Sequence, residues 1–332
     1  MPDLVRTRAH LEAGLRENRW TGYALAIRTS TGLHGLVGGD VSDLASPLPW
    51  YSAGKPITAV GVLRILESSP HLWDQPVAQT LPELAGSYAG NLTLEAILSH
   101  QTGLRILESS LRGSPKDIFV YFSRIRPADF QLTAGQAAYD PAGGWWLLGQ
   151  WLEHHAGKPW QEFLEKDLLV PAGLTGLKFS GAAAPMKERR GGKWGEVDSG
   201  AGPGAGLTGS APDLALFYQT LLEGRLLSPS SLEKMRRPTR WGKADATFGQ
   251  IVDFGLGVIL NGNQHGPATV PYGFGTAAGE KSFGHGGARS SIAFADPDVG
   301  FSAAIFLQGR VPEAEHQPRM RTVLDLLRSE LV

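Results

Sequence analysis

The sequence predicts an α+β fold, in which an antiparallel sheet flanked by helices is built from both ends of the chain and the middle forms a helical insert. Short apolar segments of β type lie near the start of the chain and return in its last third. The residues between them follow a mostly helical pattern with long loops. We therefore predict a sheet domain from residues 1–75 and 224–332, a mostly helical domain from residues 76–223, and an active site at their junction, where ligand sites tend to form.

The first part of the sheet domain is predicted to contain two helices and a strand pair. Residues 1–19 carry leucines on one stripe of a charged segment, which is typical of an amphipathic helix. Strands are expected at 22–28 and 33–37, with a Thr-Gly turn between them. Ser52 then opens a strongly apolar helix that runs to about Glu67.

The remaining elements change in type along the chain. The helical segments expected in the middle are 94–99, 145–155, 160–168 and 213–222. The strands expected afterwards are 254–260, 282–285, 290–294 and 301–307, followed by an amphipathic helix from about 313 to 331. These returning strands are the reason for placing both ends of the chain in one sheet.

Composition excludes several classes of function. The 332 residues carry 31 basic and 32 acidic side chains with no basic stripe, so neither nucleic acid nor an anionic membrane is an expected partner. The absence of cysteine excludes disulfides, thiolate metal sites and cysteine nucleophiles. No apolar run approaches the roughly 18 residues of a membrane helix, and residues 1–19 lack the apolar core of a secretory signal, so we expect a cytoplasmic protein. The nine histidines show no clustered ligand spacing, so neither a metal nor another cofactor is expected.

The motif Ser-x-x-Lys occurs twice, and one copy lies in a setting that suits catalysis. Ser231 and Lys234 belong to a polar stretch that predicts a capped surface helix. Ser52 and Lys55 are followed at once by an apolar helix. Positions i and i+3 share a helix face, so the lysine amine can approach the serine hydroxyl. The free N–H groups at the helix start favour a developing alkoxide.

The lysine amine must lose its proton before it can act as a base. A lysine with a pKa of about 10.4 is neutral in only about one molecule in 2,500 at pH 7. Apolar burial and the positive end of the helix dipole both disfavour the ammonium and can lower its pKa towards 7. The alternative is that Ser52 merely caps the helix and that the Lys55 side chain extends to solvent. This segment alone leaves both interpretations open.

Two further motifs follow in order along the chain. Tyr139 lies just before an apolar helix, in Ala-Tyr-Asp-Pro-Ala-Gly-Gly, and Gly284–Gly287 (Gly-His-Gly-Gly) precedes two predicted strands. Together with Ser52–Lys55, these motifs resemble the class C β-lactamase-like family, which includes D-Ala-D-Ala carboxypeptidases and related esterases. The connecting segments 98–104 and 206–215 are also similar to that family. The resemblance covers almost the whole chain and implies a β-lactamase/transpeptidase-like fold.

The resemblance implies a role for each matched residue. Ser52 is implied as the nucleophile, and Lys55 and Tyr139 as the groups that take and return its proton. The backbone N–H groups of Ser52 and Ala288 are implied as an oxyanion hole. His285 is implied to line the site rather than to act as a triad base. The expected substrate-binding residues are His285, Gly286, Gly287, Trp50, Tyr51 and Asp140, with a place in the core as the alternative for Trp50 and Tyr51.

One position departs from the family's pattern. Pro141 stands where the family has the asparagine of its Tyr-x-Asn element, and proline has no side-chain amide to hold a β-lactam or a peptide. The expected function is therefore acyl transfer from a small-molecule carboxylic ester, either to water (an esterase) or to an amine or alcohol (a transacylase). A β-lactamase, a D-amino-acid peptidase and a non-catalytic ligand-binding protein remain alternatives. Neither the acyl donor nor the oligomeric state follows from the sequence.

Two other features have simpler explanations. Gly204–Gly209 satisfies the dinucleotide-binding pattern G-x-G-x-x-G, but the preceding residues are polar and glycine-rich where a strand is required. Ser210 as a helix cap, with Asp213 in the first turn, explains the following helix better. Arg289, which follows the glycine-rich strand, is expected to form an exposed salt bridge, with a contact to substrate as the alternative.

Overall fold

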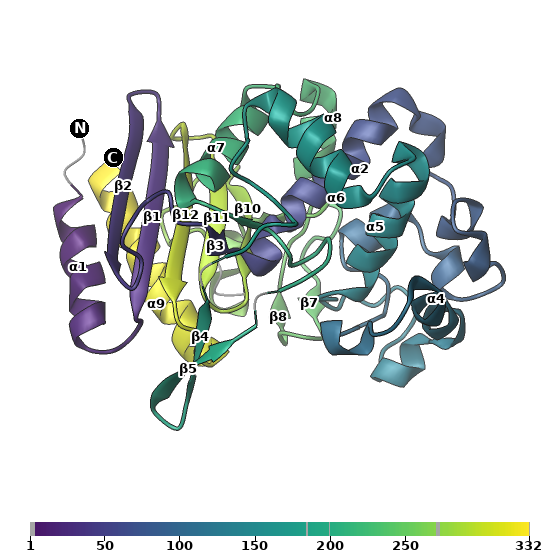
Figure 1. Cartoon of the computed structure of the whole chain (residues 1–332), viewed down its shortest axis with the longest axis horizontal. Helices are drawn as coiled ribbons and strands as arrows, with labels where there is room; N and C mark the ends of the chain where they lie inside the picture. The colour runs from purple at the N-terminus through teal and green to yellow at the C-terminus, as the bar shows by residue number, and fades with distance from the viewer. Residues whose placement is uncertain (1–3, 184, 199, 270–272, 332) are drawn as a thin grey trace.

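A six-stranded antiparallel sheet made from both ends of the chain organises the molecule, and it confirms the predicted fold class (Figure 1). The computed structural model describes residues 4–183, 185–198, 200–269 and 273–331. The order of strands across the sheet is β2-β1-β12-β11-β10-β9. The strands of the whole molecule are β1 Gly22–Thr29, β2 Gly32–Gly39, β3 Leu48–Pro49, β4 Met186–Arg190, β5 Lys193–Val197, β6 Thr208–Gly209, β7 Ala244–Asp245, β8 Gln250–Ile251, β9 Ile259–Leu260, β10 Phe283–Gly287, β11 Ser291–Asp296 and β12 Phe301–Gln308.

The helices occupy the segments where the apolar pattern has a helical period. They are α1 Val5–Arg16, α2 Lys55–Ser68, α3 Leu94–Leu98, α4 Pro115–Arg124, α5 Gly143–Ala156, α6 Trp160–Glu162, α7 Ala211–Leu222, α8 Pro229–Arg236 and α9 Glu313–Leu331. Short 3₁₀ turns connect many of them, and a π-helix, Phe163–Leu169, continues α6. The polar segment around Ser231 forms α8 as predicted, with Ser228 as its cap.

The register of β1 makes the two ends of the chain neighbours. Leu25 in β1 opposes Leu36 in β2 on one side and Ile305 in β12 on the other. A hairpin from the N-terminal part thus pairs directly with the last strand before α9. The early strand pair and the returning strands of the last third are therefore parts of one sheet.

Helices cover both faces of this sheet. In β1, Leu25 and Ile27 belong to the apolar cluster that includes residues of α1 and α9. Ala24 and Ala26 belong to the cluster that includes residues of α2, α5 and α7. This alternation is the period of two that a strand imposes on its side chains. Figure 1 shows α1 and α9 beside the sheet at the left, and α4 and α5 beyond α2 at the right.

The helix α7 links the sheet to the middle of the chain. It lies within the predicted helical domain, residues 76–223, yet it packs against β1, β11 and β12. The Ser302 hydroxyl in β12 donates a hydrogen bond of 2.8 Å to the carbonyl of Ala215 in α7. The boundary between the two domains therefore stays a prediction, and α7 shares its packing with the sheet.

Two predicted elements end differently in the structure. Only Ile259–Leu260 of the predicted strand 254–260 joins the sheet. Gly257 has a φ of +72°, and a Cβ there would lie 2.4 Å from the Cβ of Ala59, so the chain turns where it packs against α2. The prediction that Ser52 opens an α-helix is also wrong in detail, because a 3₁₀ turn, Tyr51–Gly54, precedes α2.

The hairpin of β4 and β5 has no counterpart in the sequence prediction. Its strands read MKERR and KWGEV, which lack the apolar alternation of a half-buried strand. The hairpin projects from the body of the molecule (Figure 1).

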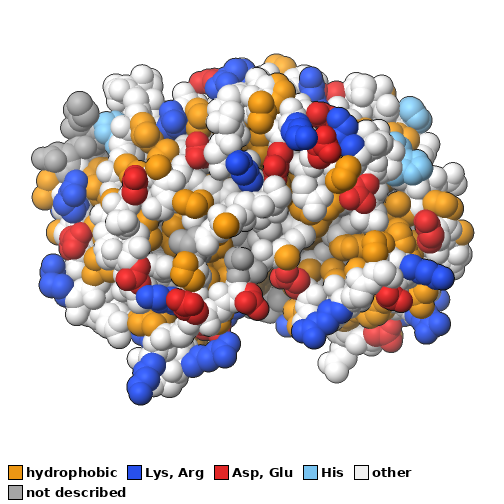
Figure 2. All heavy atoms as spheres, in the orientation of Figure 1, with side chains coloured by type: hydrophobic (Ala, Val, Ile, Leu, Met, Phe, Trp, Pro, Cys, Tyr) orange, Lys and Arg blue, Asp and Glu red, His pale blue; other side chains and the backbone are white. Residues whose placement is uncertain are grey.

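Acidic and basic side chains are intermixed over the face shown in Figure 2. No helix in the described part of the chain is both long and apolar enough to cross a bilayer.

Candidate active site

Ser52 and Lys55 lie together at the start of α2. Ser52 is the second residue of the 3₁₀ turn, and the first, Tyr51, has a left-handed φ of +50°. The Lys55 side chain is fully buried. Its Nζ lies 3.1 Å from Ser52 Oγ and donates hydrogen bonds of 2.8 Å to the carbonyls of both Pro141 and Gly204. The interpretation of Lys55 as a side chain that extends to solvent is therefore wrong.

Burial changes the protonation of this amine. Desolvation lowers the pKa of Lys55 from 10.5 to about 7, against the opposing charges of Asp140 and Glu108. Near neutral pH a large fraction of the amine is therefore uncharged. A neutral amine has two N–H groups, and the carbonyls of Pro141 and Gly204 accept both. The lone pair then faces the Ser52 hydroxyl, which is the arrangement a general base requires.

Tyr139 lies on the other side of the serine. Burial raises the pKa of its phenol well above the ordinary value, in spite of a hydrogen bond with Ser52 that lowers it. The ring centroid lies 5.5 Å from Lys55 Nζ and packs against the His100 ring at 4.6 Å. The structure thus brings together the predicted nucleophile and the two residues predicted to handle its proton, with the tyrosine in its neutral form.

The strand β10 forms the opposite wall and leads to Ala288. Ser52 and Ala288 line one pocket, so their backbone N–H groups stay the predicted oxyanion hole. The turn after β10 holds Ala288 and Arg289 at left-handed φ values of +39° and +59°. The buried Arg319 guanidinium donates a 2.8 Å hydrogen bond to the Arg289 carbonyl, which fixes this turn to α9.

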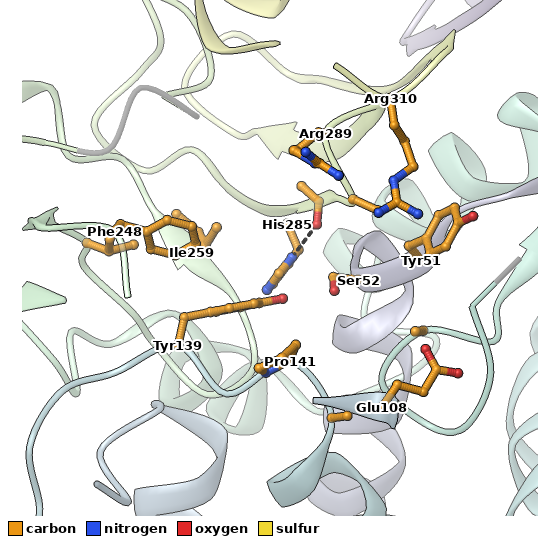
Figure 3. A pocket seen from close by; sticks show the side chains of 15 residues that line it. Tyr51, Ser52, Glu108, Tyr139, Pro141, Phe248, Ile259, His285, Arg289 and Arg310 are labelled. Atoms are coloured by element: carbon orange, nitrogen blue, oxygen red, sulfur yellow. Dashed lines mark hydrogen bonds between the residues drawn. The ribbon is translucent and has the colours of Figure 1, made fainter. Parts of the chain in front are cut away.

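His285 lies beside the tyrosine and is neutral. Burial, together with the charge of Lys55, lowers its pKa to about 3. Its Nδ1 pairs with the Gly286 carbonyl at 2.7 Å, as the dashed line in Figure 3 shows. Its Nε2 has no hydrogen-bond partner within the described residues. The ring lines the pocket, with its centroid 5.9 Å from that of Tyr139.

The pocket has a volume of about 300 Å³ and two ends of different character. Phe248 and Ile259 lie at one end in Figure 3, whereas Arg310 and Glu108 lie near Tyr51 at the other. The lining residues are Tyr51, Ser52, Glu108, Tyr139, Pro141, Ala142, Ala205, Phe248, Val252, Ile259, His285, Gly286, Ala288, Arg289 and Arg310. An apolar group fits one end and a polar group the other.

A carboxylate on the projecting hairpin holds the arginines of the polar end. Glu188 Oε1 in β4 lies 2.9 Å from Arg289 and 3.5 Å from Arg310. Arg289 therefore both lines the pocket and forms the expected salt bridge. The sequence did not predict Glu188, Arg310 or Phe248 as pocket residues, because none of them belongs to a predicted helix, strand or motif.

Three predicted substrate-binding residues, Trp50, Asp140 and Gly287, do not line this pocket. Trp50 is fully buried, donates its indole N–H to the Gly209 carbonyl at 2.8 Å, and packs edge-on against Phe306. The Asp140 carboxylate is also buried and accepts the N–H groups of Gly143 and Gly144 at 3.0 and 2.7 Å, so it serves the start of α5. For both side chains the prediction of substrate contact is corrected. The other predicted residues, Tyr51, His285 and Gly286, do line the pocket.

Gly287 has a packing role in place of the predicted contact. A Cβ at this position would lie 2.1 Å from the Trp50 carbonyl oxygen and 3.2 Å from the Ala53 nitrogen. The absence of a side chain therefore lets β10 press against the turn that carries Ser52. Among the described residues, no group of three or more His, Asp or Glu side chains is placed to hold a metal ion.

This sheet, with a Ser-x-x-Lys turn packed against a Gly-His-Gly-Gly strand, is typical of the β-lactamase/transpeptidase-like fold. The family model described as Beta-lactamase matches residues 8–328, and the chain belongs to that family. A "Putative D-alanyl-D-alanine carboxypeptidase" of Escherichia coli O157:H7 is 28% identical over 211 residues, which are 52% of this chain and 46% of that protein. The chain thus spans about half the length of this curated relative.

Solved structures share the fold across the whole chain. A penicillin-binding protein homolog from Caulobacter crescentus superposes with a TM-score of 0.79 at 21% identity, covering 98% of this chain and 97% of that one. EstCE1, described as a hydrolase with promiscuous acyltransferase activity, also gives a TM-score of 0.79, at 17% identity, covering 96% of this chain and 97% of that one. At these identities the likeness concerns the fold.

The contact of Gly287 with the serine turn yields a prediction. Gly287→Ala should push β10 away from Ser52. The free energy of unfolding should fall by about 1–3 kcal/mol, and kcat for an activated ester should fall roughly 100-fold. Gly195→Ala in β5 is the matched control, since a Cβ there has no neighbour within 4 Å. Thermal unfolding and ester turnover measure the two effects. Equal behaviour of the two variants would contradict the packing role.

The lowered pKa of Lys55 predicts how the reactivity of Ser52 depends on pH. The amine accepts the serine proton only when neutral, so labelling of Ser52 by a fluorophosphonate should rise with pH through a midpoint of about 7. At pH 5 only about 1% of an amine with that pKa is neutral. His285, with a pKa of about 3, does not titrate in this range.

The control is Glu108→Gln, because burial raises the pKa of that carboxyl and it lines the same pocket. The rise with pH should persist in this variant, with its midpoint at slightly lower pH, because the Glu108 charge raises the pKa of Lys55. A labelling rate that is flat between pH 5 and pH 9 would refute the assignment of Lys55 as the base.

Proposed function

We propose that this chain is a serine acyl-transfer enzyme that acts on a small-molecule carboxylic ester through an acyl-enzyme on Ser52. The observation that carries the proposal is the buried Lys55 amine, 3.1 Å from Ser52 Oγ, with its pKa lowered to about 7. A serine hydroxyl is a weak nucleophile until a neighbouring base takes its proton. Such general-base assistance typically contributes about 10²–10⁴ in rate.

In the acylation step, the Ser52 oxygen bonds to the ester carbonyl carbon while its proton passes to the neutral Lys55 amine. The carbonyl oxygen becomes an oxyanion, which accepts the N–H groups of Ser52 and Ala288; one such donor is worth about 3–4 kcal/mol. The carbon–oxygen bond of the ester then breaks. The departing alkoxide takes a proton from Tyr139, which is replenished from the Lys55 ammonium.

In the second step, an acceptor replaces the departed alcohol. Water or an amine attacks the acyl carbon, Tyr139 and Lys55 take its proton, and the bond to Ser52 Oγ breaks as the serine regains a proton. Hydrolysis gives a carboxylic acid, and transfer to an amine gives an amide. Both outcomes use the same groups, so the acceptor is chosen by what occupies the pocket beside the acyl-enzyme.

Pro141 favours an ester over an amide substrate. Its ring lines the pocket and offers no N–H or carbonyl group from a side chain, whereas an amide or β-lactam substrate presents polar groups that need a partner. An ester has no N–H to satisfy. The similarity to EstCE1 supports a hydrolase with acyltransferase capacity. The carboxypeptidase name of the Escherichia coli relative keeps a D-amino-acid peptidase as the second candidate.

Covalent labelling tests the nucleophile. Incubation with a fluorophosphonate should add the mass of one adduct to the intact protein. Ser52→Ala should abolish this adduct, because the variant lacks the only hydroxyl held against the Lys55 amine in the described structure. Ser231→Ala, in the second Ser-x-x-Lys motif, is the matched control and should label normally. An adduct that persists in Ser52→Ala would refute the proposal, and no adduct at all would favour a non-catalytic member of the fold.

The acceptor is tested by product analysis. With p-nitrophenyl butyrate and increasing amounts of a primary amine, a transacylase should form the amide faster than butyric acid. If acylation limits turnover, the rate of nitrophenol release should not change as amine is added. A hydrolase should form the acid alone. Liquid chromatography with mass spectrometry separates the two products. Turnover of a D-alanyl-D-alanine peptide faster than of the ester would instead favour the peptidase.

A further inference from the structure

The backbone that carries Tyr139 is held from two sides by residues outside the sequence motifs. The Tyr139 N–H donates to Asp245 Oδ1 at 3.1 Å, and the Thr247 hydroxyl donates to the Tyr139 carbonyl at 3.1 Å. On the other side, the Asp140 N–H donates to His100 Nδ1 at 3.0 Å. The Ala138 N–H donates to the His100 carbonyl at 3.1 Å. The tyrosine is therefore fixed through its main chain.

Asp245 is in turn held by a fully buried ion pair. Its Oδ2 lies 2.9 Å from Arg240, and neither side chain is exposed. Arg240 also donates to the His100 carbonyl at 3.3 Å and to the Val252 carbonyl at 2.9 Å. One guanidinium thus connects both sides of the clamp around Tyr139.

A buried ion pair is a weak source of stability, because the cost of removing two charges from water offsets their attraction. Its effect on geometry is stronger, since the fork of a guanidinium sets the positions of several acceptors at once. Here the guanidinium forms the ion pair with Asp245 and donates to the carbonyls of His100 and Val252. Asp245 Oδ1 further accepts the N–H of Phe248 at 3.3 Å, and Phe248 forms the apolar end of the pocket.

We propose that Asp245 is a positioning residue, which sets the Tyr139 hydroxyl against Ser52 without touching the substrate, and that Arg240 balances its buried charge. The inference rests on the proposed role of Tyr139 in proton transfer. Neither residue lines the pocket among the described residues. Asp245 acts through its Oδ1, which accepts the N–H of the tyrosine main chain.

Two double variants isolate this acceptor. Arg240→Met with Asp245→Asn removes both charges and keeps an oxygen for the Tyr139 N–H, whereas Arg240→Met with Asp245→Leu removes the charges and the oxygen. Both avoid a buried charge left unpaired. With p-nitrophenyl butyrate, the Asn variant should keep kcat within about threefold of the parent, and the Leu variant should lose about 10- to 100-fold, since small misplacements of a catalytic group cost up to about 10² in rate.

The same exchange is then made in Tyr139→Phe. There the step from Asn to Leu at position 245 should change kcat less than about threefold, because the hydroxyl that it misplaces is gone. Thermal unfolding of each variant, with kcat measured well below the transition, separates loss of fold from loss of position. A purely structural role would give the same step in both backgrounds.

The outcomes separate this inference from the proposed function. If Tyr139→Phe alone leaves kcat unchanged, the role of the tyrosine in the proposed function fails. If Tyr139→Phe lowers kcat but the Asn and Leu double variants are equal, the positioning role is overturned and the proposed function stands. Equal losses from Asn to Leu with and without the tyrosine hydroxyl would also overturn it.

Discussion

The burial of one amine organises the centre of this molecule. Lys55 Nζ meets the carbonyls of Pro141 and Gly204, residues that lie far from it in the sequence. Its approach needs a bare backbone: a Cβ on Gly204 would lie 3.0 Å from the nitrogen. Thr58, one turn further along α2, donates to the Pro203 carbonyl at 2.6 Å and holds the same segment. The loop before α5 and the glycine-rich segment before α7 are thus both tied to the start of α2.

A buried, uncharged amine is costly to place, and the surrounding structure supplies what it needs. Two carbonyls accept its N–H groups, and aromatic rings close the space around it, with the Trp145 centroid at 4.9 Å. This enclosure excludes water, which strengthens every polar contact of the site. The cost of desolvation and the lowered pKa have the same cause. A lysine that reached solvent at this position would keep its ordinary pKa and would stay charged near neutral pH.

The parts of the fold and site that sequence predicted are those encoded by local patterns. Alternating residues located the strands of both chain ends, and the short Ser52–Lys55 motif is confined to one helical turn. The Arg240–Asp245 pair and the contact of Glu188 with Arg289 could not be predicted, because nothing in the sequence around such residues indicates a partner. Glu188 and Arg289 are 101 positions apart. Their pairing is a product of the tertiary fold.

The errors at Trp50 and Asp140 have a different cause. Both are adjacent in sequence to a site residue, but neighbouring side chains along a chain point in different directions. Trp50 turns into the core, and Asp140 turns to the start of α5, where the dipole and the free N–H groups favour a carboxylate. Tyr51 reaches the pocket at the cost of a left-handed backbone. Adjacency to a motif therefore predicts proximity, and the local backbone decides the direction.

Pro141 makes one contact through its main chain and another through its side chain. Its carbonyl accepts the Lys55 amine at 2.8 Å, a main-chain contact that any residue could make. Its side chain, which in the resembling family supplies an amide to the substrate, is here an apolar ring on the pocket wall. Proline also fixes φ, so the carbonyl is held with less freedom than in asparagine. Proline at this position thus keeps the contact with the Lys55 amine and lacks an amide that would recognise an amide substrate, and this separation is the physical ground for the proposed ester chemistry at Ser52.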